Sequence, residues 1–143
     1  MKIDFNYRFK DLNGKDIPEW PDKVEKDKDG KEVIDKDGKK VMKKYPPFTL
    51  KMACVIVLLA PELGKITCSQ CRAVLVAPKE LTGEEKVTRG LLATEIHKGG
   101  LVDVGTKDIE LLKGLIAKEY TSLIVMQAWA TLDPHEVEER KKK

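Results

Sequence analysis

The first nine residues of the chain alternate between apolar and polar side chains. The apolar positions are Ile3, Phe5, Tyr7 and Phe9. A period of two is typical of a strand with one buried face, so we expect a half-buried strand at the start of the chain. Asn13 and Gly14 come soon after and predict a turn, because both residue types tolerate a positive φ angle.

A short repeat with a spacing of eight residues follows this turn. Residues 27–30 read Asp-Lys-Asp-Gly, and residues 35–38 read the same four letters. Asp-Gly pairs flanked by β-branched residues are typical of β-hairpins, so we expect two turns that join short strands. The alternative is calcium binding, but a helix-loop-helix calcium loop needs a third carboxylate and a closing Glu at fixed spacing. Neither copy has them, and the hairpin interpretation is favoured.

After residue 45 the hydrophobic pattern becomes helical. Residues 50–59 are apolar on every side and follow Thr49, which predicts a buried helix with that threonine as its cap. The β-branched residues in this segment leave a buried strand as the alternative. Residues 71–78 resemble residues 54–61, because each segment runs from a Cys to an Ala-Pro pair. A small duplication, or two core segments that each end at a proline, explains this likeness.

Three further helices are predicted. The first begins with a capping box, Thr82 to Glu85, and ends at Gly99. We expect its apolar stripe to contain Val87, Leu91, Leu92 and Ile96. An extended link over residues 101–104 then leads to a second helix, which we expect Thr106 to cap.

The second of these helices has a clear apolar stripe of Ile109, Leu112, Leu115 and Ile116. We expect its charged residues to face water, namely Lys107, Glu110, Lys113 and Lys118. The third helix begins near Ser122 and is apolar nearly all round, which places Trp129 in the core. Pro134 ends or kinks this helix before a charged tail.

These patterns together predict an α+β fold, in which an N-terminal strand and β-hairpins are followed by a helical body of about four helices. The 143 residues fit a single domain. Within it we expect a β-rich part over residues 1–45, the helical body over residues 46–133 and the charged tail over residues 134–143.

Composition narrows the functional class without identifying a function. The chain has 27 basic and 24 acidic residues, and their signs interleave, so nucleic acid is unlikely to be a direct partner. The longest apolar run, residues 53–61, is too short to span a membrane. Three cysteines favour a reducing compartment, and we expect the cytoplasm. Only four amide side chains in a chain rich in Lys and Glu favour a thermophilic source.

The residues offer little chemistry. Cys68 and Cys71 have the spacing of two zinc ligands, but a structural zinc site needs four, and the remaining candidates are Cys54, His97 and His135. A redox pair would need a βαβ context that the sequence lacks, so we favour ordinary small side chains at both positions. No nucleophile elbow, phosphate loop or dinucleotide motif is present. We therefore expect neither an enzyme, nor a cofactor, nor a small-molecule substrate.

Three aromatic residues stand in proline-flanked, loop-like segments: Trp20, Tyr45 and Phe48. Large aromatic side chains in surface loops are often anchors for a partner protein, and these three are our candidate partner-binding residues. The alternative, which the sequence favours, is that they fold back over the junction between the strand and the helices.

The opening Lys2-Ile3-Asp4-Phe5, the turn at residues 12–15, the helix start at residues 82–86 and the helical pair that follows residues 102–104 resemble small accessory proteins of tailed bacteriophages. The chain is similar to the family of Thermus-phage proteins that bind host RNA polymerase and promote antitermination. The resemblance implies a non-enzymatic regulator that binds a host protein in the host cytoplasm. Two alternatives are a virion assembly or structural accessory protein, and a small zinc-dependent module that binds nucleic acid.

Overall fold

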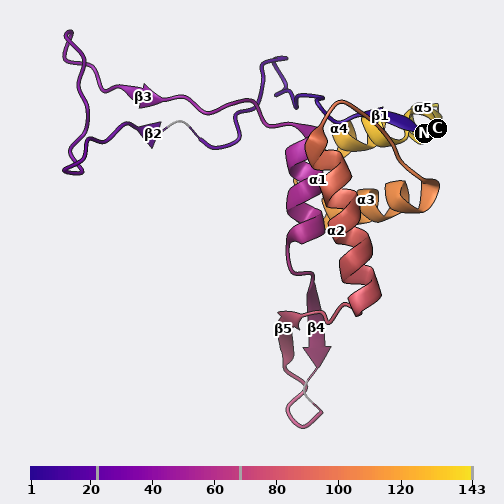
Figure 1. Ribbon diagram of the computed structural model, residues 1–143. Helices are drawn as coiled ribbons and strands as arrows, with labels where there is room; N and C mark the ends of the chain where they lie inside the picture. Colours follow the sequence, from indigo (N-terminus) through magenta and orange to yellow (C-terminus); the bar gives the residue numbers. More distant parts are fainter. Residues whose placement is uncertain (22, 68, 143) are drawn as a thin grey trace. The chain divides into compact units, whose positions relative to one another are not determined.

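The computed structural model describes residues 1–21, 23–67 and 69–142, without the side chain of residue 66. Short antiparallel strands and helices form an α+β fold with a helical body (Figure 1). The chain divides into two compact units, one made of Met1–Tyr7 with Leu50–Lys143 and the other of Arg8–Thr49. The unit boundaries therefore fall at residues 8 and 49, whereas the sequence pattern changes at residue 45.

The unit Arg8–Thr49 contains three copies of one turn, over residues 11–15, 27–31 and 35–39. In each copy the first aspartate accepts two backbone N–H groups, two and four residues ahead, at 2.8 to 2.9 Å. The glycines have φ angles of 74° to 77°, a region that favours glycine. Both predicted turns are confirmed, and the turn at Asn13–Gly14 is a third copy. Each closes a single isolated bridge, however, and does not join two strands as predicted. Since one oxygen of each aspartate already accepts two N–H groups, the turns explain the repeat without calcium.

Backbone hydrogen bonds organise this unit into two rings of three residues. Ile17 N donates to Phe9 O (2.9 Å), Phe48 N to Ile17 O (2.7 Å) and Phe9 N to Phe48 O (3.0 Å). A second ring with bonds of 2.8 to 2.9 Å joins residues 25, 33 and 41. The repeat spacing of eight residues places one ring position before and after each turn. The strands β2 (Lys23–Val24) and β3 (Met42–Lys43) pair antiparallel between the rings (Figure 1).

The other unit contains the helices and two small antiparallel sheets. Its helices are α1 (Leu50–Leu59), α2 (Gly83–Lys98), α3 (Thr106–Glu119), α4 (Ser122–Leu132) and α5 (Pro134–Lys141). Its strands are β1 (Lys2–Asp4), paired with β6 (Leu101–Asp103), and β4 (Leu63–Thr67), paired with β5 (Val74–Pro78). The predicted opening strand is present but ends at Asp4, although the alternating pattern continues to Phe9, and it pairs with the predicted extended link. No helix in the described residues is long and apolar enough to cross a membrane.

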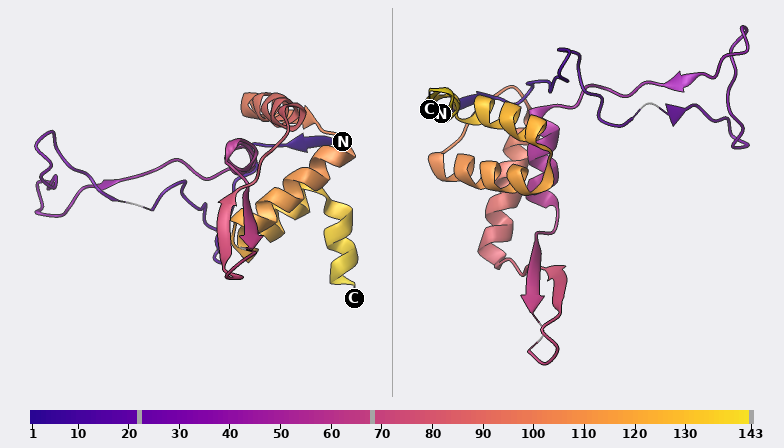
Figure 2. Two further views of the ribbon diagram at one scale, coloured as in Figure 1. Left: turned by 90° about the horizontal axis from the view of Figure 1, so that it is seen from below. Right: turned by 180° about the vertical axis from the view of Figure 1, so that it is seen from behind.

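The core of this unit lies where α1 packs against α2 and α3, and α3 packs against α4 (Figure 2). The predicted stripe of α3 is buried as expected. The largest fully buried side chains are Ile3, Phe5, Leu50, Ile96, Leu112, Ile116 and Leu132. The start of α2 confirms the predicted capping box, because the N-cap Thr82 and Glu85 exchange side-chain and backbone hydrogen bonds.

Several helical predictions are wrong in detail. The buried residues of α2 are Arg89, Ala93 and Ile96, whereas Val87 and Leu91 of the predicted stripe are exposed. The N-cap of α3 is Gly105, so Thr106 is already the first helical residue. Helix α1 is not buried on every side, because Ile56 and Leu59 are exposed. The predicted charged tail is mostly helix α5, since Pro134 fits the first turn, where no N–H needs a partner.

Lys113 is the clearest exception to the expected solvent-facing side of α3. Its side chain is buried, and its Nζ pairs with Asp133 (3.1 Å) and Glu136. Burial alone would lower the pKa of Lys113, but the hydrogen bonds from the two carboxylates raise it overall. The Nζ atom also lies 4.9 Å from the ring centre of Trp129. The charged group therefore joins α3 to the junction of α4 and α5.

Candidate functional site

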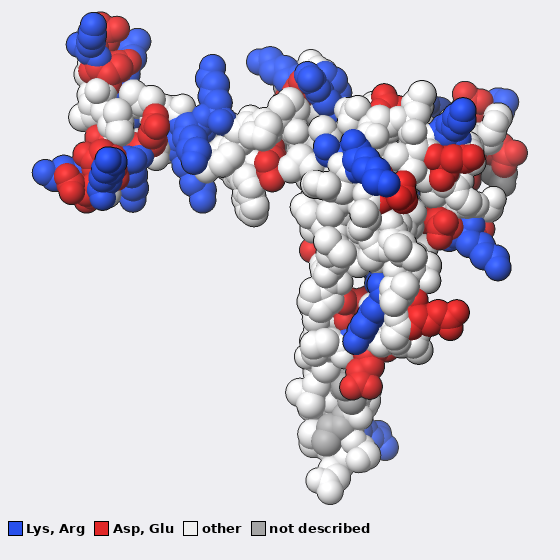
Figure 3. Space-filling model, in the orientation of Figure 1, with Lys and Arg blue, Asp and Glu red and all other residues white. Residues whose placement is uncertain are grey.

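The β4–β5 hairpin exposes apolar side chains that a folded protein normally buries. The strand β5 begins Val74-Leu75-Val76, and all three side chains are exposed on both faces of the ribbon. Leu63 of β4 and Leu59 at the end of α1 are exposed as well. We call these five residues, Leu59, Leu63, Val74, Leu75 and Val76, the hairpin surface. Figure 3 shows few charged side chains over this part of the molecule.

The backbone of the hairpin is also exposed, at the outer edges of its two strands. The two strands pair only with each other, from Leu63 opposite Pro78 to Thr67 opposite Val74. Each strand therefore has one edge with no strand beside it among the described residues. A near-continuous apolar run is typical of strands that are covered on both faces, and exposed apolar edges invite pairing with another chain. Both features make the hairpin a candidate contact surface.

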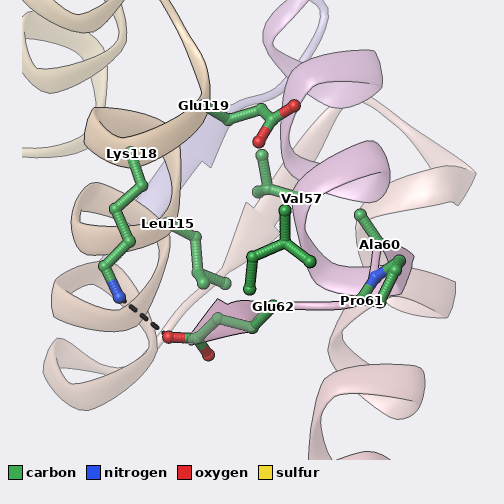
Figure 4. Close-up of a pocket in the computed structure, with 8 residues that line it drawn as sticks. Val57, Ala60, Pro61, Glu62, Leu115, Lys118 and Glu119 are labelled. Carbon is green, nitrogen blue, oxygen red and sulfur yellow. Dashed lines mark hydrogen bonds and ion pairs between the residues drawn. The ribbon is translucent and has the colours of Figure 1, made fainter. Parts of the chain in front are cut away.

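Glu62 fixes the base of the hairpin to two helices. Its carboxylate pairs with Arg89 of α2 (Oε2 to Nη2, 2.9 Å) and with Lys118 of α3 (Oε1 to Nζ, 2.8 Å), the second of which is drawn in Figure 4. Its carbonyl oxygen accepts the backbone N–H of Lys79 at 2.6 Å, which closes the hairpin. The exposed ribbon thus starts from a rigid base rather than from a loose loop.

Two open hollows flank Glu62. One, of about 480 Å³, has Val57, Pro61 and Leu115 among its apolar walls and Glu119 at its edge (Figure 4). The other, of about 500 Å³, is lined by Leu58, Leu59, Pro78 and Leu81 together with charged residues. Both include Ala60, Pro61 and Glu62. The hollows extend the apolar surface from the hairpin onto the end of α1.

The ionisable groups at this site are suited to holding structure rather than to proton transfer. Hydrogen bonds from Lys118 and Arg89 lower the pKa of Glu62 to about 2, so the carboxylate stays ionised at neutral pH. The buried Arg89 has one further nitrogen, Nη1, without a hydrogen-bond partner in the described residues. Glu62 is therefore the acid that compensates this buried cation.

The cysteines and histidines of the proposed zinc site are only partly described. Cys54 is buried in α1, and burial raises the pKa of its thiol to about 12, which makes it a poor metal ligand. Cys71 is exposed in the turn of the β4–β5 hairpin, and Cys68 lies outside the described residues. His97 and His135 are exposed near the end of α2 and the start of α5. Within residues 1–21, 23–67 and 69–142, no three metal-binding side chains form a cluster.

The three aromatic candidates have different surroundings. Trp20 is 56% exposed, and Tyr45 is half-buried with Lys43 Nζ 5.6 Å from its ring centre. Phe48 is 8% exposed, and its ring centre lies 5.3 Å from that of the buried Phe9. Burial favours a packing role for Phe48, which was the alternative given by the sequence. Partner binding by Trp20 and Tyr45 stays a prediction.

The sequence pattern does not predict the hairpin surface, because an apolar run normally indicates a core segment. Residues 71–78 resemble residues 54–61 in sequence, but residues 74–78 are a largely exposed strand, whereas residues 54–61 are mostly helix with several buried side chains. Charge gives no separate signal, because the segment 63–79 has cations and no acid, but so do residues 38–61. No protein-family model, curated protein sequence or solved structure matches this chain.

Proposed function

We propose that the protein is a non-enzymatic, phage-encoded regulator that binds host RNA polymerase by protein–protein contact through the hairpin surface. The observation that carries the binding role is the exposure of Val74, Leu75 and Val76 on a ribbon with two unpaired edges. Water is a poor solvent for such a surface, and covering it yields roughly 25 cal/mol for each Å² of apolar area. A partner that adds a strand would also satisfy the open backbone groups.

Two ionisable groups, Glu62 at the hairpin base and the buried Cys54 of α1, favour binding over catalysis. A general acid or base works best with a pKa near the working pH, whereas the pKa of Glu62 is about 2. The thiol of Cys54, with a pKa of about 12, is buried and almost fully protonated at neutral pH. Glu62 therefore stabilises the base of the hairpin through its ion pairs, and binding is left to the apolar side chains of the hairpin.

The choice of polymerase as partner rests on the resemblance of residues 2–5, 12–15 and 82–86 to small phage accessory proteins. In such a regulator a rigid body presents an exposed element that alters a larger machine by steric or allosteric contact. The β4–β5 hairpin fits this description, because Glu62 at its base forms ion pairs with α2 and α3.

The test is affinity capture from a lysate of phage-infected cells with the full chain immobilised, followed by mass spectrometry of the retained proteins. Val76→Lys places a charge on the hairpin surface and Val87→Lys is its matched control, because these valines are 64% and 62% exposed. Neither substitution removes a buried contact, and circular dichroism checks that both variants fold. We expect recovery of polymerase subunits with the wild-type chain and with Val87→Lys, and at least tenfold less with Val76→Lys.

Recovery of capsid or tail proteins without polymerase would favour the alternative of a virion assembly protein and would contradict the proposed regulator. Equal recovery of polymerase with both valine variants would separate the two parts of the proposal, because polymerase binding would stand while the hairpin surface would not be the contact.

A further inference from the structure

A third hollow, remote in sequence from the hairpin, is lined by residues of α3, α4 and α5 and of the turn between α3 and α4. It has a volume of about 480 Å³. Its apolar walls are Tyr120 after α3, Val125 and Met126 on α4, and Val137 on α5. Met126 is 54% exposed, so the hollow opens to solvent along α4. We call it the α4–α5 groove.

Trp129 forms part of this groove and is held in place before any partner arrives. Its Nε1 donates to the backbone oxygen of Lys113 at 3.3 Å. The guanidinium of Arg140 lies 5.4 Å from its ring centre, and Glu136 orients that guanidinium through Oε1 at 2.6 and 3.2 Å. Trp, Tyr and Arg are the residue types that dominate binding energy at interfaces. Because these side chains are already ordered, a partner loses less entropy when it binds them.

The charges that line the groove are all positive. They belong to Arg140 and Lys141, and no Asp or Glu is among the lining residues. The charge of Arg140 is balanced by Glu136, but Lys141 has no acidic partner among the described residues. A lysine without an acidic partner at one edge of an apolar floor favours a binding partner with acidic residues beside apolar ones, because charge complementarity speeds encounter and selects partners.

We infer that the α4–α5 groove binds an acidic amphipathic helix of another protein. The groove lies between helices, and a third helix offers apolar side chains at a spacing of three and four residues to such a floor. Acidic residues on its flanks would face Lys141 and the Arg140 edge. This site does not depend on the hairpin surface, so the two proposals stand or fall separately.

The test uses the full chain with Trp20→Phe, which leaves Trp129 as the only tryptophan. A display library of random peptides of about 16 residues, long enough for four helical turns, is selected on this protein. We expect enriched peptides to combine Leu, Phe or Trp at helical spacing with a net negative charge, and to shift the fluorescence of Trp129 on binding. We expect a synthetic copy of the best peptide to bind three- to tenfold more weakly to Lys141→Glu, since a rim charge contributes about 1 kcal/mol.

Lys107→Glu is the matched control, because Lys107 is also exposed and lies at the other end of α3. It should bind the peptide like the parent chain, and Met126→Ala should bind it about tenfold more weakly. Enrichment of basic peptides, equal binding by Lys141→Glu, or no enrichment would overturn the inference. So would a dimer in sedimentation experiments that Met126→Ala dissociates, because the groove would then bind a second copy of the chain.

Discussion

The side chain of Glu62 joins the exposed β4–β5 hairpin to helices α2 and α3 through ion pairs. It is the acid that pairs with the buried Arg89, and its loss leaves a cation in a site that water does not reach. We predict that Glu62→Gln lowers the free energy of unfolding by about 2 kcal/mol, measured by chemical denaturation. Glu119→Gln, an exposed acid at the edge of the same hollow, should change it by less than about 0.5 kcal/mol.

The same carboxylate makes stability depend on acid. The pKa of Glu62 falls from an ordinary 4.5 to about 2 in the folded chain, so the unfolded chain takes up the proton first as pH falls. The stabilisation from the ion pairs is complete above about pH 5 and is lost progressively toward pH 2. We predict that the difference in unfolding free energy between the wild-type chain and Glu62→Gln shrinks over this range. A difference that stays constant from pH 7 to pH 2 would contradict this assignment.

Lys113 plays a similar part at the other end of α3. Its removal would leave Asp133 and Glu136 facing each other near Trp129, without the cation between them. We predict that Lys113→Met lowers the free energy of unfolding by about 1–2 kcal/mol and speeds amide hydrogen exchange in α5. Lys107→Met on the exposed start of the same helix is the control and should leave exchange in α5 unchanged. Protection of α5 in both variants would show that the charge does not hold it.

At the scale of elements, the sequence predicts what local chemistry determines and misses what long-range pairing determines. The capping box of α2 is readable because both of its partners lie within four residues. The burial of Arg89 cannot be predicted from local sequence, because it depends on Glu62, which lies 27 residues earlier. The predicted burial of the β5 segment is wrong for a related reason. An apolar run indicates that something covers the strand, but it does not show that the covering residues belong to the same chain.

The capping box gives a prediction confined to one helix. Thr82→Ala removes the hydroxyl that accepts the N–H of Glu85, and we expect it to lower the free energy of unfolding by about 1 kcal/mol. Thr88→Ala is the same change at an exposed position inside α2, where alanine is the better helix former, so it should be neutral or slightly stabilising. Thermal or urea denaturation compares the stability of the two variants. Equal changes in unfolding free energy would mean that the Thr82 cap does not stabilise α2.

At the scale of the whole molecule, the division into two units follows from where the hydrogen bonds close. The rings at residues 9, 17 and 48 and at residues 25, 33 and 41 are complete within Arg8–Thr49, and each turn between ring positions satisfies its own amides. The buried apolar residues of the helical unit come from residues 1–7 and from residues 50–132. Among the described residues, each of the three sheets pairs strands of one and the same unit.

We therefore predict that the helical unit survives removal of most of the other unit. Pro18 and Pro47 form an antiparallel bridge, so a two-residue Asn-Gly turn can replace residues 19–46 while the ring of Phe9, Ile17 and Phe48 stays. The shortened chain should keep its helical circular dichroism signal and the amide protection of α1 and α3, because those helices bury the same side chains as before.

Gly38→Ala in the full chain is a smaller perturbation of the same unit. The φ of 74° at this position strains any residue other than glycine, so amide exchange should speed up around residues 35–39 while α1 stays protected. Loss of protection in α1 in either variant would mean that the two units fold as one, and the eight-residue repeats would then contribute to the stability of the helices.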